Sequence, residues 1–175
     1  MKGKSEVRVV TFKLGNEQYG ISVQNVREII KAKSYTKIPN APPYFEGVIN
    51  LRGQILPVIN LKKLLKGDTS STNFSENNRD DKSRDPQQAR IIIAELDEES
   101  FGLLVDQVIG VMQIDKDSIA PLPSYVMSGE HPVVDSIIKS GEDLVMLLDI
   151  RNLLSKVTSG TLHQTEPRTV MSIKA

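Results

Sequence analysis

The sequence contains no cysteine, which excludes disulfide bridges and thiolate metal ligands. No segment approaches the about 18 consecutive apolar residues of a membrane-spanning helix. The first ten residues, MKGKSEVRVV, lack the apolar run of a secretory signal. We therefore expect a cytoplasmic protein. Its 175 residues, 39% apolar and 25% charged, fit one globular domain or two small ones packed together.

Side chains that carry chemistry are also scarce. The two histidines, His131 and His163, do not stand at ligand or triad spacing from each other or from a carboxylate pair. The glycines of GNEQYG (15–20) have the wrong spacing for a phosphate-binding loop and predict a hairpin turn instead. The sequence therefore predicts a protein that is not an enzyme and holds no metal or cofactor.

The net charge is zero, but acidic residues are scarce in the first part of the chain and basic residues are scarce in the later part. Residues 1–66 carry 12 Lys/Arg against 4 Asp/Glu, and residues 91–155 carry 3 Lys/Arg against 12 Asp/Glu. Two interpretations are open. In the first, the two parts neutralise each other across their own contact. In the second, a bipolar molecule presents basic and acidic ends to different partners.

The remaining segments have sequence patterns that predict mainly β-strands. VRVVTFKL (7–14) is rich in β-branched residues, and a hairpin runs through VINL, turns at Arg52-Gly53-Gln54 and returns through ILPVI. Asn60 then precedes LKKLL, where it is a suitable N-cap for a short helix. By contrast, residues 66–89 contain Phe74 as their only large apolar side chain, which predicts a flexible loop or linker.

This plan occurs twice. RVVTFKLGNEQYGISVQNV (8–26) aligns without a gap with RIIIAELDEESFGLLVDQV (90–108) at an offset of 82, and ILPVINLKKLL (55–65) aligns with LVMLLDIRNLL (144–154) at an offset of 89. Asp149 takes the position of Asn60 in the second copy. The pattern indicates a duplicated unit, with the additional residues of the second copy between the two matched segments.

The duplication predicts a mainly β fold of two small barrels packed side by side, with short helices. A unit of some 60 residues is marginal alone, so the two should share an apolar interface. Barrel closure removes the exposed edges of short strands. The expected division is a first barrel over 6–66, a loop over 67–89, a second barrel over 90–155 and a C-terminal tail over 156–175. The apolar residues of the tail show no steady period, which favours disorder.

The run FEGVINLRGQILPVINLKKLL (45–65) resembles the signature of the CheW family, the adaptors of bacterial chemotaxis arrays. Further similarity lies in EQYGISVQNVREI (17–29), FGLLVDQVIGV (101–111) and LVMLLDIRNLL (144–154). The resemblance implies two five-stranded, SH3-like barrels. It also implies a scaffold that couples the cytoplasmic tips of methyl-accepting chemotaxis receptors to the regulatory domain of the histidine kinase CheA. The protein would then lie at receptor arrays and reach the membrane only through receptors.

The resemblance further implies a receptor groove between the barrels, in which a receptor helix would dock its apolar stripe. Its residues would be Val26, Glu28, Gly47, Arg52, Ile91, Gly102, Val108 and Val111. Similarity suggests that Arg52 faces Glu28 there. Alternatively, each Val or Ile in this set only packs in a hydrophobic core, and Arg52 is only an exposed, solubilising turn residue. Residues that contact the kinase are not assigned.

Nucleic-acid binding is the alternative function, because residues 1–66 are basic and small barrels bind nucleic acid in some families. Stacking platforms for bases need exposed aromatic rings beside the cations. Phe12 and Tyr19 fall at core positions, whereas Tyr35, Tyr44 and Phe45 fall in or near loops. A solvated basic face is the favoured interpretation, so we expect no nucleic-acid partner.

Overall fold

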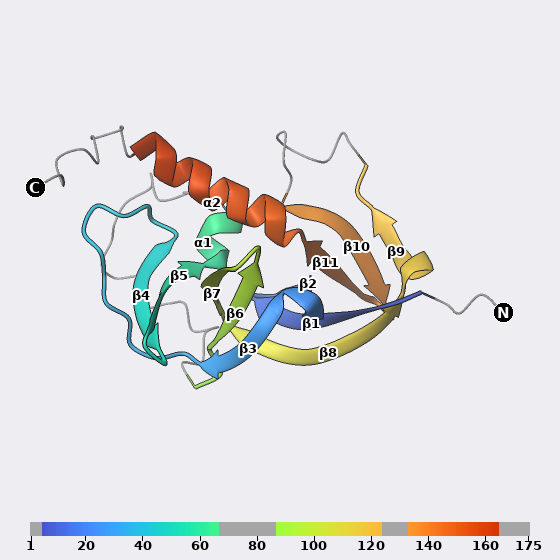
Figure 1. The fold of residues 1–175 in the computed structure, drawn as a ribbon. Helices are drawn as coiled ribbons and strands as arrows, with labels where there is room; N and C mark the ends of the chain where they lie inside the picture. Colours follow the sequence, from blue (N-terminus) through green and yellow to red (C-terminus); the bar gives the residue numbers. More distant parts are fainter. Residues whose placement is uncertain (1–4, 67–86, 124–132, 165–175) are drawn as a thin grey trace, which may run out of the picture.

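The structure, a computed structural model, describes residues 5–66, 87–123 and 133–164, and these consist mainly of β-strands (Figure 1). The first half (residues 5–66) contains β1 (Glu6–Leu14), β2 (Glu17–Ser22), the 3-10 turn η1 (Val23–Asn25), β3 (Val26–Lys31), β4 (Phe45–Leu51), β5 (Gln54–Asn60) and helix α1 (Leu61–Lys66). The second half (residues 87–164) contains β6 (Arg90–Leu96), β7 (Glu99–Val105), β8 (Gln107–Asp115), η2 (Lys116–Ser118), β9 (Ile119–Pro121), β10 (Val134–Ser140), β11 (Asp143–Leu148) and helix α2 (Ile150–Gln164).

The two halves have the same order of elements, as the internal repeat predicts. Strands β1, β2 and β3 correspond to β6, β7 and β8, and β4, β5 and α1 correspond to β10, β11 and α2. The additional residues of the second half lie between β8 and β10, where η2 and β9 occur. Asn60 and Asp149 cap the two helices: their Oδ1 atoms accept hydrogen bonds from the backbone N–H of Lys63 and Asn152, each at 3.1 Å.

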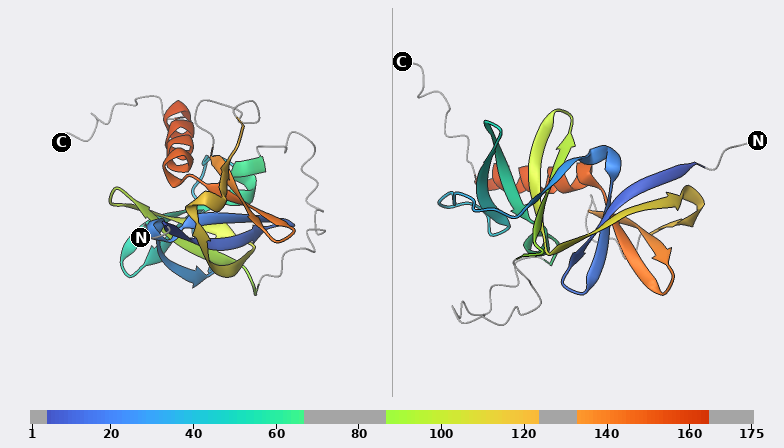
Figure 2. Two further views of the ribbon diagram at one scale, coloured as in Figure 1. Left: turned by 90° about the vertical axis from the view of Figure 1, so that its right-hand side faces the viewer. Right: turned by 90° about the horizontal axis from the view of Figure 1, so that it is seen from below.

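The strands form two SH3-like barrels packed side by side, which confirms the predicted fold class (Figure 2). The six-stranded barrel has the order β8-β1-β2-β11-β10-β9, and the five-stranded barrel has the order β3-β6-β7-β5-β4. Under the repeat correspondence, both contain the same order of five strands. The sixth strand, β9, belongs to the insertion of the second half.

The halves do not each form one barrel, which differs from the expected division into 6–66 and 90–155. Hairpin β1–β2 of the first half completes the barrel that contains β8, β10 and β11, and hairpin β6–β7 of the second half completes the barrel that contains β3, β4 and β5. The chain crosses between barrels at η1 and again at Asp106. Because the duplicated hairpins are so similar, repeat analysis does not reveal which copy each hairpin joins.

The largest hydrophobic core lies between the barrels, as expected for two marginal units. It combines Phe12 and Ile21 of the six-stranded barrel with Ile59, Ile92 and Leu103 of the five-stranded barrel, all at most 1% exposed. Each barrel also has a smaller core of its own, around Ile49, Leu56 and Ile93 or around Val9, Ile138 and Val145. Separation of the two barrels would therefore expose apolar side chains of both.

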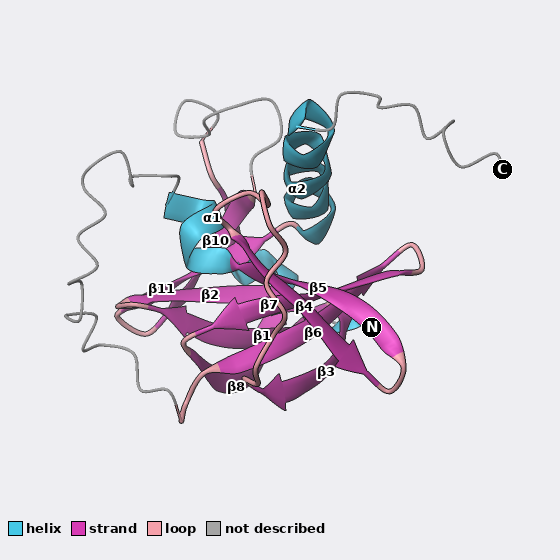
Figure 3. Ribbon diagram, turned by 90° about the vertical axis from the view of Figure 1, so that its left-hand side faces the viewer, coloured by secondary structure: helices cyan, strands magenta, loops and turns pink. Residues whose placement is uncertain are grey.

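Helix α2 extends beyond the predicted start of the tail at residue 156. Its apolar residues Ile150, Leu153, Leu154 and Val157 follow helical spacing and pack on the shared core. The Tyr44 hydroxyl donates a hydrogen bond to the Val157 carbonyl at 3.3 Å. Both helices cover one side of the molecule, whereas β3 and β8 lie on the opposite side (Figure 3). Most of the predicted loop, 67–86, and of the tail, 165–175, lies outside the described residues.

Candidate functional site

Two edge strands expose aliphatic side chains on the side of the molecule away from the helices. Strand β3 is an edge of the five-stranded sheet and β8 is an edge of the six-stranded sheet. Ile29 on β3 is 38% exposed, and on β8 Ile109 is 47% and Val111 is 57% exposed. Ile29 and Val111 occupy equivalent positions of the repeat. Both edges thus expose apolar side chains at equivalent positions of the repeat, and both strands lie on the side opposite the helices (Figure 3). We call the line between β3 of one barrel and β8 of the other the seam.

Sequence reasoning identified Val111 but missed Ile29 and Ile109. The available signal was strand alternation, because Arg27 and Lys31 share one face of β3 and Ile29 lies between them on that face. All three are exposed, whereas Val26, Glu28 and Ile30 are half-buried. An isoleucine flanked at both i±2 positions by cations is thereby marked as outward-facing.

Arg52 and Glu28 meet beside this seam. The Arg52 guanidinium Nη2 donates to Glu28 Oε2 at 2.9 Å, and the two side chains are 73% and 22% exposed. Arg52 and Gly53 both have positive φ, 52° and 84°, so they form the tip of a tight hairpin between β4 and β5. The Arg52 side chain thereby reaches from this turn to β3, and its planar donor fork matches the geometry of the Glu28 carboxylate.

Two further contacts join the same hairpin to β3 and the segment that follows it. Arg27 Nη1 donates to Gln54 Oε1 at 3.2 Å, and Lys33 Nζ donates to the Asn50 carbonyl at 2.8 Å. Together with the Arg52 contact, they connect the two ends of the five-stranded sheet, whose order places β3 and β4 at opposite edges. The hairpin and β3 consequently form one surface.

Val26 is the first residue of β3 and Val108 is the second residue of β8, and both are half-buried against the shared core. Val26 also lines an open pocket next to the point where the chain crosses between barrels. The pocket is bordered by Gln24, Asn25, Val26 and Arg27 of the first half and by Glu95, Leu96 and Asp97 of the second. The two valines therefore join the seam surface to the core beneath it.

The remaining three predicted residues, Gly47, Ile91 and Gly102, are buried. Ile91 has no exposed surface, and a Cβ added to Gly102 would lie 2.7 Å from Ile91 Cγ2. A Cβ on Gly47, whose φ is +154°, would lie 2.3 Å from the Thr36 carbonyl oxygen. The structure thus gives these residues a packing role: they allow close approach of backbone or side chains and present no surface of their own.

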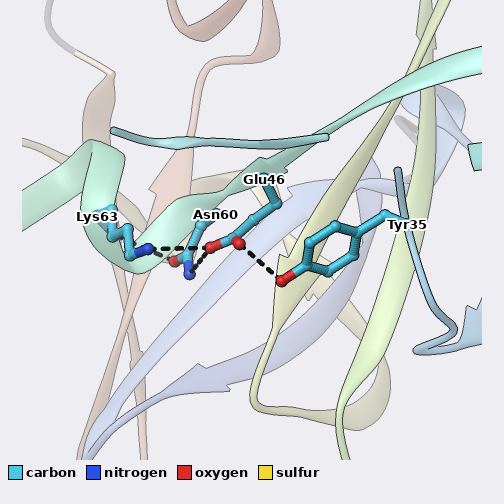
Figure 4. Close-up of polar contacts among 4 residues, drawn as sticks. All are labelled: Tyr35, Glu46, Asn60 and Lys63. Atoms are coloured by element: carbon cyan, nitrogen blue, oxygen red, sulfur yellow. Dashed lines mark hydrogen bonds and ion pairs between the residues drawn. The ribbon is translucent and has the colours of Figure 1, made fainter. Parts of the chain in front are cut away.

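A polar cluster missed by sequence reasoning surrounds the carboxylate of Glu46 on β4 (Figure 4). Glu46 Oε2 accepts a hydrogen bond from the Tyr35 hydroxyl at 2.7 Å, and Glu46 Oε1 accepts one from Asn60 Nδ2 at 2.8 Å. Lys63 Nζ lies 3.2 Å from Glu46 Oε1. Burial of Glu46 alone would raise the pKa of its carboxyl. The hydrogen bonds from Asn60 and Tyr35 and the charge of Lys63 outweigh burial, and they hold that pKa below its ordinary value.

The described residues offer neither catalytic nor base-stacking groups at this surface. Within the described ranges, no cluster of three or more His, Cys, Asp or Glu side chains is placed to hold a metal ion. Phe12 and Tyr19 stack in the shared core with ring centroids 6.0 Å apart, and Tyr35, Tyr44 and Phe45 are at most half-exposed. His131 lies outside the described residues. The arrangement is suited to holding another protein surface.

A family model described as the CheW-like domain matches residues 8–158. The chain belongs to the CheW-like domain family. The matched range begins in β1 and ends in α2, so it contains both barrels, the seam and the hairpin that carries Arg52.

Individual relatives agree with this assignment. The chain is 29% identical over 150 residues to the chemotaxis protein CheW of Treponema pallidum, covering 86% of this chain and 83% of that protein. It is 32% identical over 156 residues to the chemotaxis protein CheW of Bacillus subtilis, covering 89% and 92%. The crystal structure of the scaffolding protein TtCheW from Thermoanaerobacter tengcongensis is similar with a TM-score of 0.68 and 35% identity, covering 83% and 90%.

These similarities establish a scaffold or adaptor family of chemotaxis whose members are not enzymes. They agree with the surface described above, which offers apolar strand edges and an ion pair. In the part of the chain that the structure describes, no helix has the length and apolar character needed to cross a membrane.

Proposed function

We propose that this chain couples the cytoplasmic tips of chemotaxis receptors to the regulatory domain of the histidine kinase CheA. The observation that carries the proposal is the matching exposure of Ile29 on β3 and of Ile109 and Val111 on β8, on either side of the seam. Membership of the CheW-like family supports it. The chain would act in the cytoplasm at receptor arrays and reach the membrane only through the receptors.

In this proposal a receptor helix lies along the seam with its apolar stripe on the exposed aliphatic side chains. An amphipathic helix in a groove places apolar residues at i, i+3, i+4 and i+7, so it can contact two strand edges at once. The cations Arg27 and Lys31 flank Ile29 on β3 and would meet acidic residues beside that stripe. The interface would therefore have an apolar centre and a charged rim.

Arg52 and Glu28 would position this surface. Their 2.9 Å contact ties the β4–β5 hairpin to β3, so the hairpin cannot move without changing the edge that the helix contacts. Val26 and Val108 would set the spacing of β3 and β8 on the shared core. Gly47, Ile91 and Gly102 would act indirectly, by allowing the close packing beneath the surface.

The proposal is tested by reconstitution of the purified chain with CheA and a receptor fragment, followed by kinase autophosphorylation. Stimulation should require all three components. Val111→Asp should abolish it, because a charge replaces an apolar contact. Leu144→Asp is the matched control, since Leu144 on β11 is 56% exposed and Val111 is 57% exposed. Equal stimulation by both variants would contradict the seam as the receptor site. Retention on RNA or DNA at physiological salt, without an effect on kinase, would favour the nucleic-acid alternative.

A further inference from the structure

Every ladder that joins one hairpin to another also joins the two halves of the chain. Within the halves, the described ladders are β1–β2, β4–β5, β6–β7, β10–β11 and the β9–β10 pair. Between the halves, the ladders are β1–β8, β2–β11, β3–β6 and β5–β7. Each half therefore has hairpins but lacks the pairings that close a barrel.

The shared core has the same property. Phe12 and Ile21 of the first half pack in one cluster with Ile92 and Leu103 of the second half. All four are at most 1% exposed in the described fold. A half without its complement would leave these side chains and four strand edges open to solvent. Each half is thus an extended association surface whose fitting partner is the other half.

Charge distinguishes the correct pairing from its alternatives. The repeat makes the halves alike in backbone, so two first halves or two second halves could form similar ladders. Such pairs would bring together two basic or two acidic segments, because residues 1–66 carry 12 Lys/Arg against 4 Asp/Glu and residues 91–155 carry the opposite excess. Pairing of unlike halves brings opposite charges together and is favoured.

The fold shows the result of this pairing. In the described residues, the five-stranded barrel with α1 carries 9 Lys/Arg against 6 Asp/Glu, and the six-stranded barrel with the described side chains of α2 carries 6 against 9. The charge separation between the barrels is thus much smaller than that between the halves. Of the two interpretations of the charge split, the neutralisation of one half by the other is the one that this arrangement favours.

We propose that the two halves form an exchangeable interface and that its partner is a second copy of this chain. In an exchanged dimer, the first half of one copy pairs with the second half of the other through the same ladders and core, and like charge disfavours pairing of like halves. Because the two halves of one chain are covalently connected, pairing within one chain is favoured over exchange at low protein concentration. This inference does not depend on receptor or kinase binding.

The test uses two full-length variants that each damage one half. Phe12→Asp places a charge in the first-half part of the shared core, and Leu103→Asp places one in the second-half part. Each variant alone should show no cooperative thermal unfolding. An equimolar mixture, unfolded and refolded together at high concentration, should recover about half of the wild-type unfolding signal per chain, because each exchanged dimer contains one undamaged pairing. Size-exclusion chromatography with light scattering should show a dimer.

The matched control is a mixture of Phe12→Asp with Ile21→Asp, in which both copies carry a damaged first half. This mixture should recover no signal, since no undamaged first half is present. Recovery in the control, or none in the test mixture, would overturn the proposal. Raising the salt concentration before refolding should lower recovery, because screening weakens the selection of unlike halves.

A second measurement covers the case in which a variant retains its fold. A protease site introduced within residues 67–86 allows the folded chain to be cut between the halves. The cut protein should elute as one complex and should regain cooperative unfolding after denaturant is added and diluted away. Separation of the fragments, or failure of the mixture to refold while the uncut chain does so, would overturn the proposal.

Discussion

Arg52 Nη2 lies 2.9 Å from Glu28 Oε2 and joins the β4–β5 hairpin to the edge strand β3. Because the Arg52 side chain is 73% exposed, solvent screens the pair, and it contributes about 0–1 kcal/mol to stability. Arg52→Ala should therefore leave the melting temperature nearly unchanged. It should reduce receptor binding and kinase stimulation, because one of the three contacts that hold the hairpin to β3 and the segment after it is lost. Arg52→Lys should restore binding only in part, since an ammonium lacks the planar fork. A large fall in melting temperature would instead show a structural role.

Glu46 gives a prediction for the dependence of stability on pH. Its carboxyl pKa is lowered in the folded protein, so the charged form contributes stability that is present above the ordinary pKa and is lost as pH falls through the folded pKa. Glu46→Gln should lower the free energy of unfolding by about 1–3 kcal/mol at pH 7. The difference from the wild type should shrink below about pH 4.5. Denaturant unfolding across this range is the measurement, with exposed Glu142→Gln as the control. A difference that is constant with pH would contradict the assigned charge.

The two helix caps should differ in cost although both occupy equivalent positions. Asp149→Ala removes a cap and should destabilise the protein by about 1 kcal/mol. Asn60→Ala removes the corresponding cap, and it also removes the hydrogen bond that Asn60 Nδ2 donates to the partly buried Glu46 carboxylate. Its total cost should therefore be larger, by about 1–3 kcal/mol. Chemical denaturation of both variants gives the comparison, and equal costs would show that the Glu46 cluster has little effect on stability.

Two glycines at positive φ should respond differently to alanine. In Gly47→Ala the new methyl group would lie 2.3 Å from the Thr36 carbonyl oxygen, so the backbone must shift. A loss of about 3 kcal/mol is expected. Gly53 also has positive φ but has no atom within 4 Å of an added Cβ. Gly53→Ala should therefore cost only the conformational strain, about 1 kcal/mol. Thermal unfolding of the two variants tests this order, and the reverse order would contradict the packing around Gly47.

Much of the fold could be predicted because the duplication shows the sequence pattern of most elements twice. Arg52-Gly53 between β4 and β5 marks a turn by its local chemistry, and Asn60 and Asp149 before the helices mark the cap positions in the same way. The exchange of hairpins between barrels could not be predicted, because β1–β2 and β6–β7 have the same pattern and fit either partner. The length of α2 was underestimated because Ile150, Leu153, Leu154 and Val157 form one helical stripe that crosses the assumed boundary at residue 156.

For the site, the pairing of Arg52 with Glu28 was expected from family similarity and is present. The burial of Ile91 and Gly102 was not apparent, because aliphatic and glycine residues in a strand can face either side until the sheet order is known. Ile109 was missed for the same reason, whereas the flanking cations Arg27 and Lys31 were an available signal for Ile29 that was not used. The exposure of both isoleucines follows from the edge positions of β3 and β8, which depend on the exchange between barrels.

We propose that a receptor helix binds along the seam between β3 and β8. An NMR titration of the isotope-labelled chain with a receptor cytoplasmic fragment would detect this binding residue by residue. We predict that changes in amide signals concentrate on β3, β8 and the Arg52 hairpin, with Ile29, Ile109 and Val111 among the most affected. Signal changes confined to β10, β11 or the helices, with β3 and β8 unaffected at saturation, would contradict the claim.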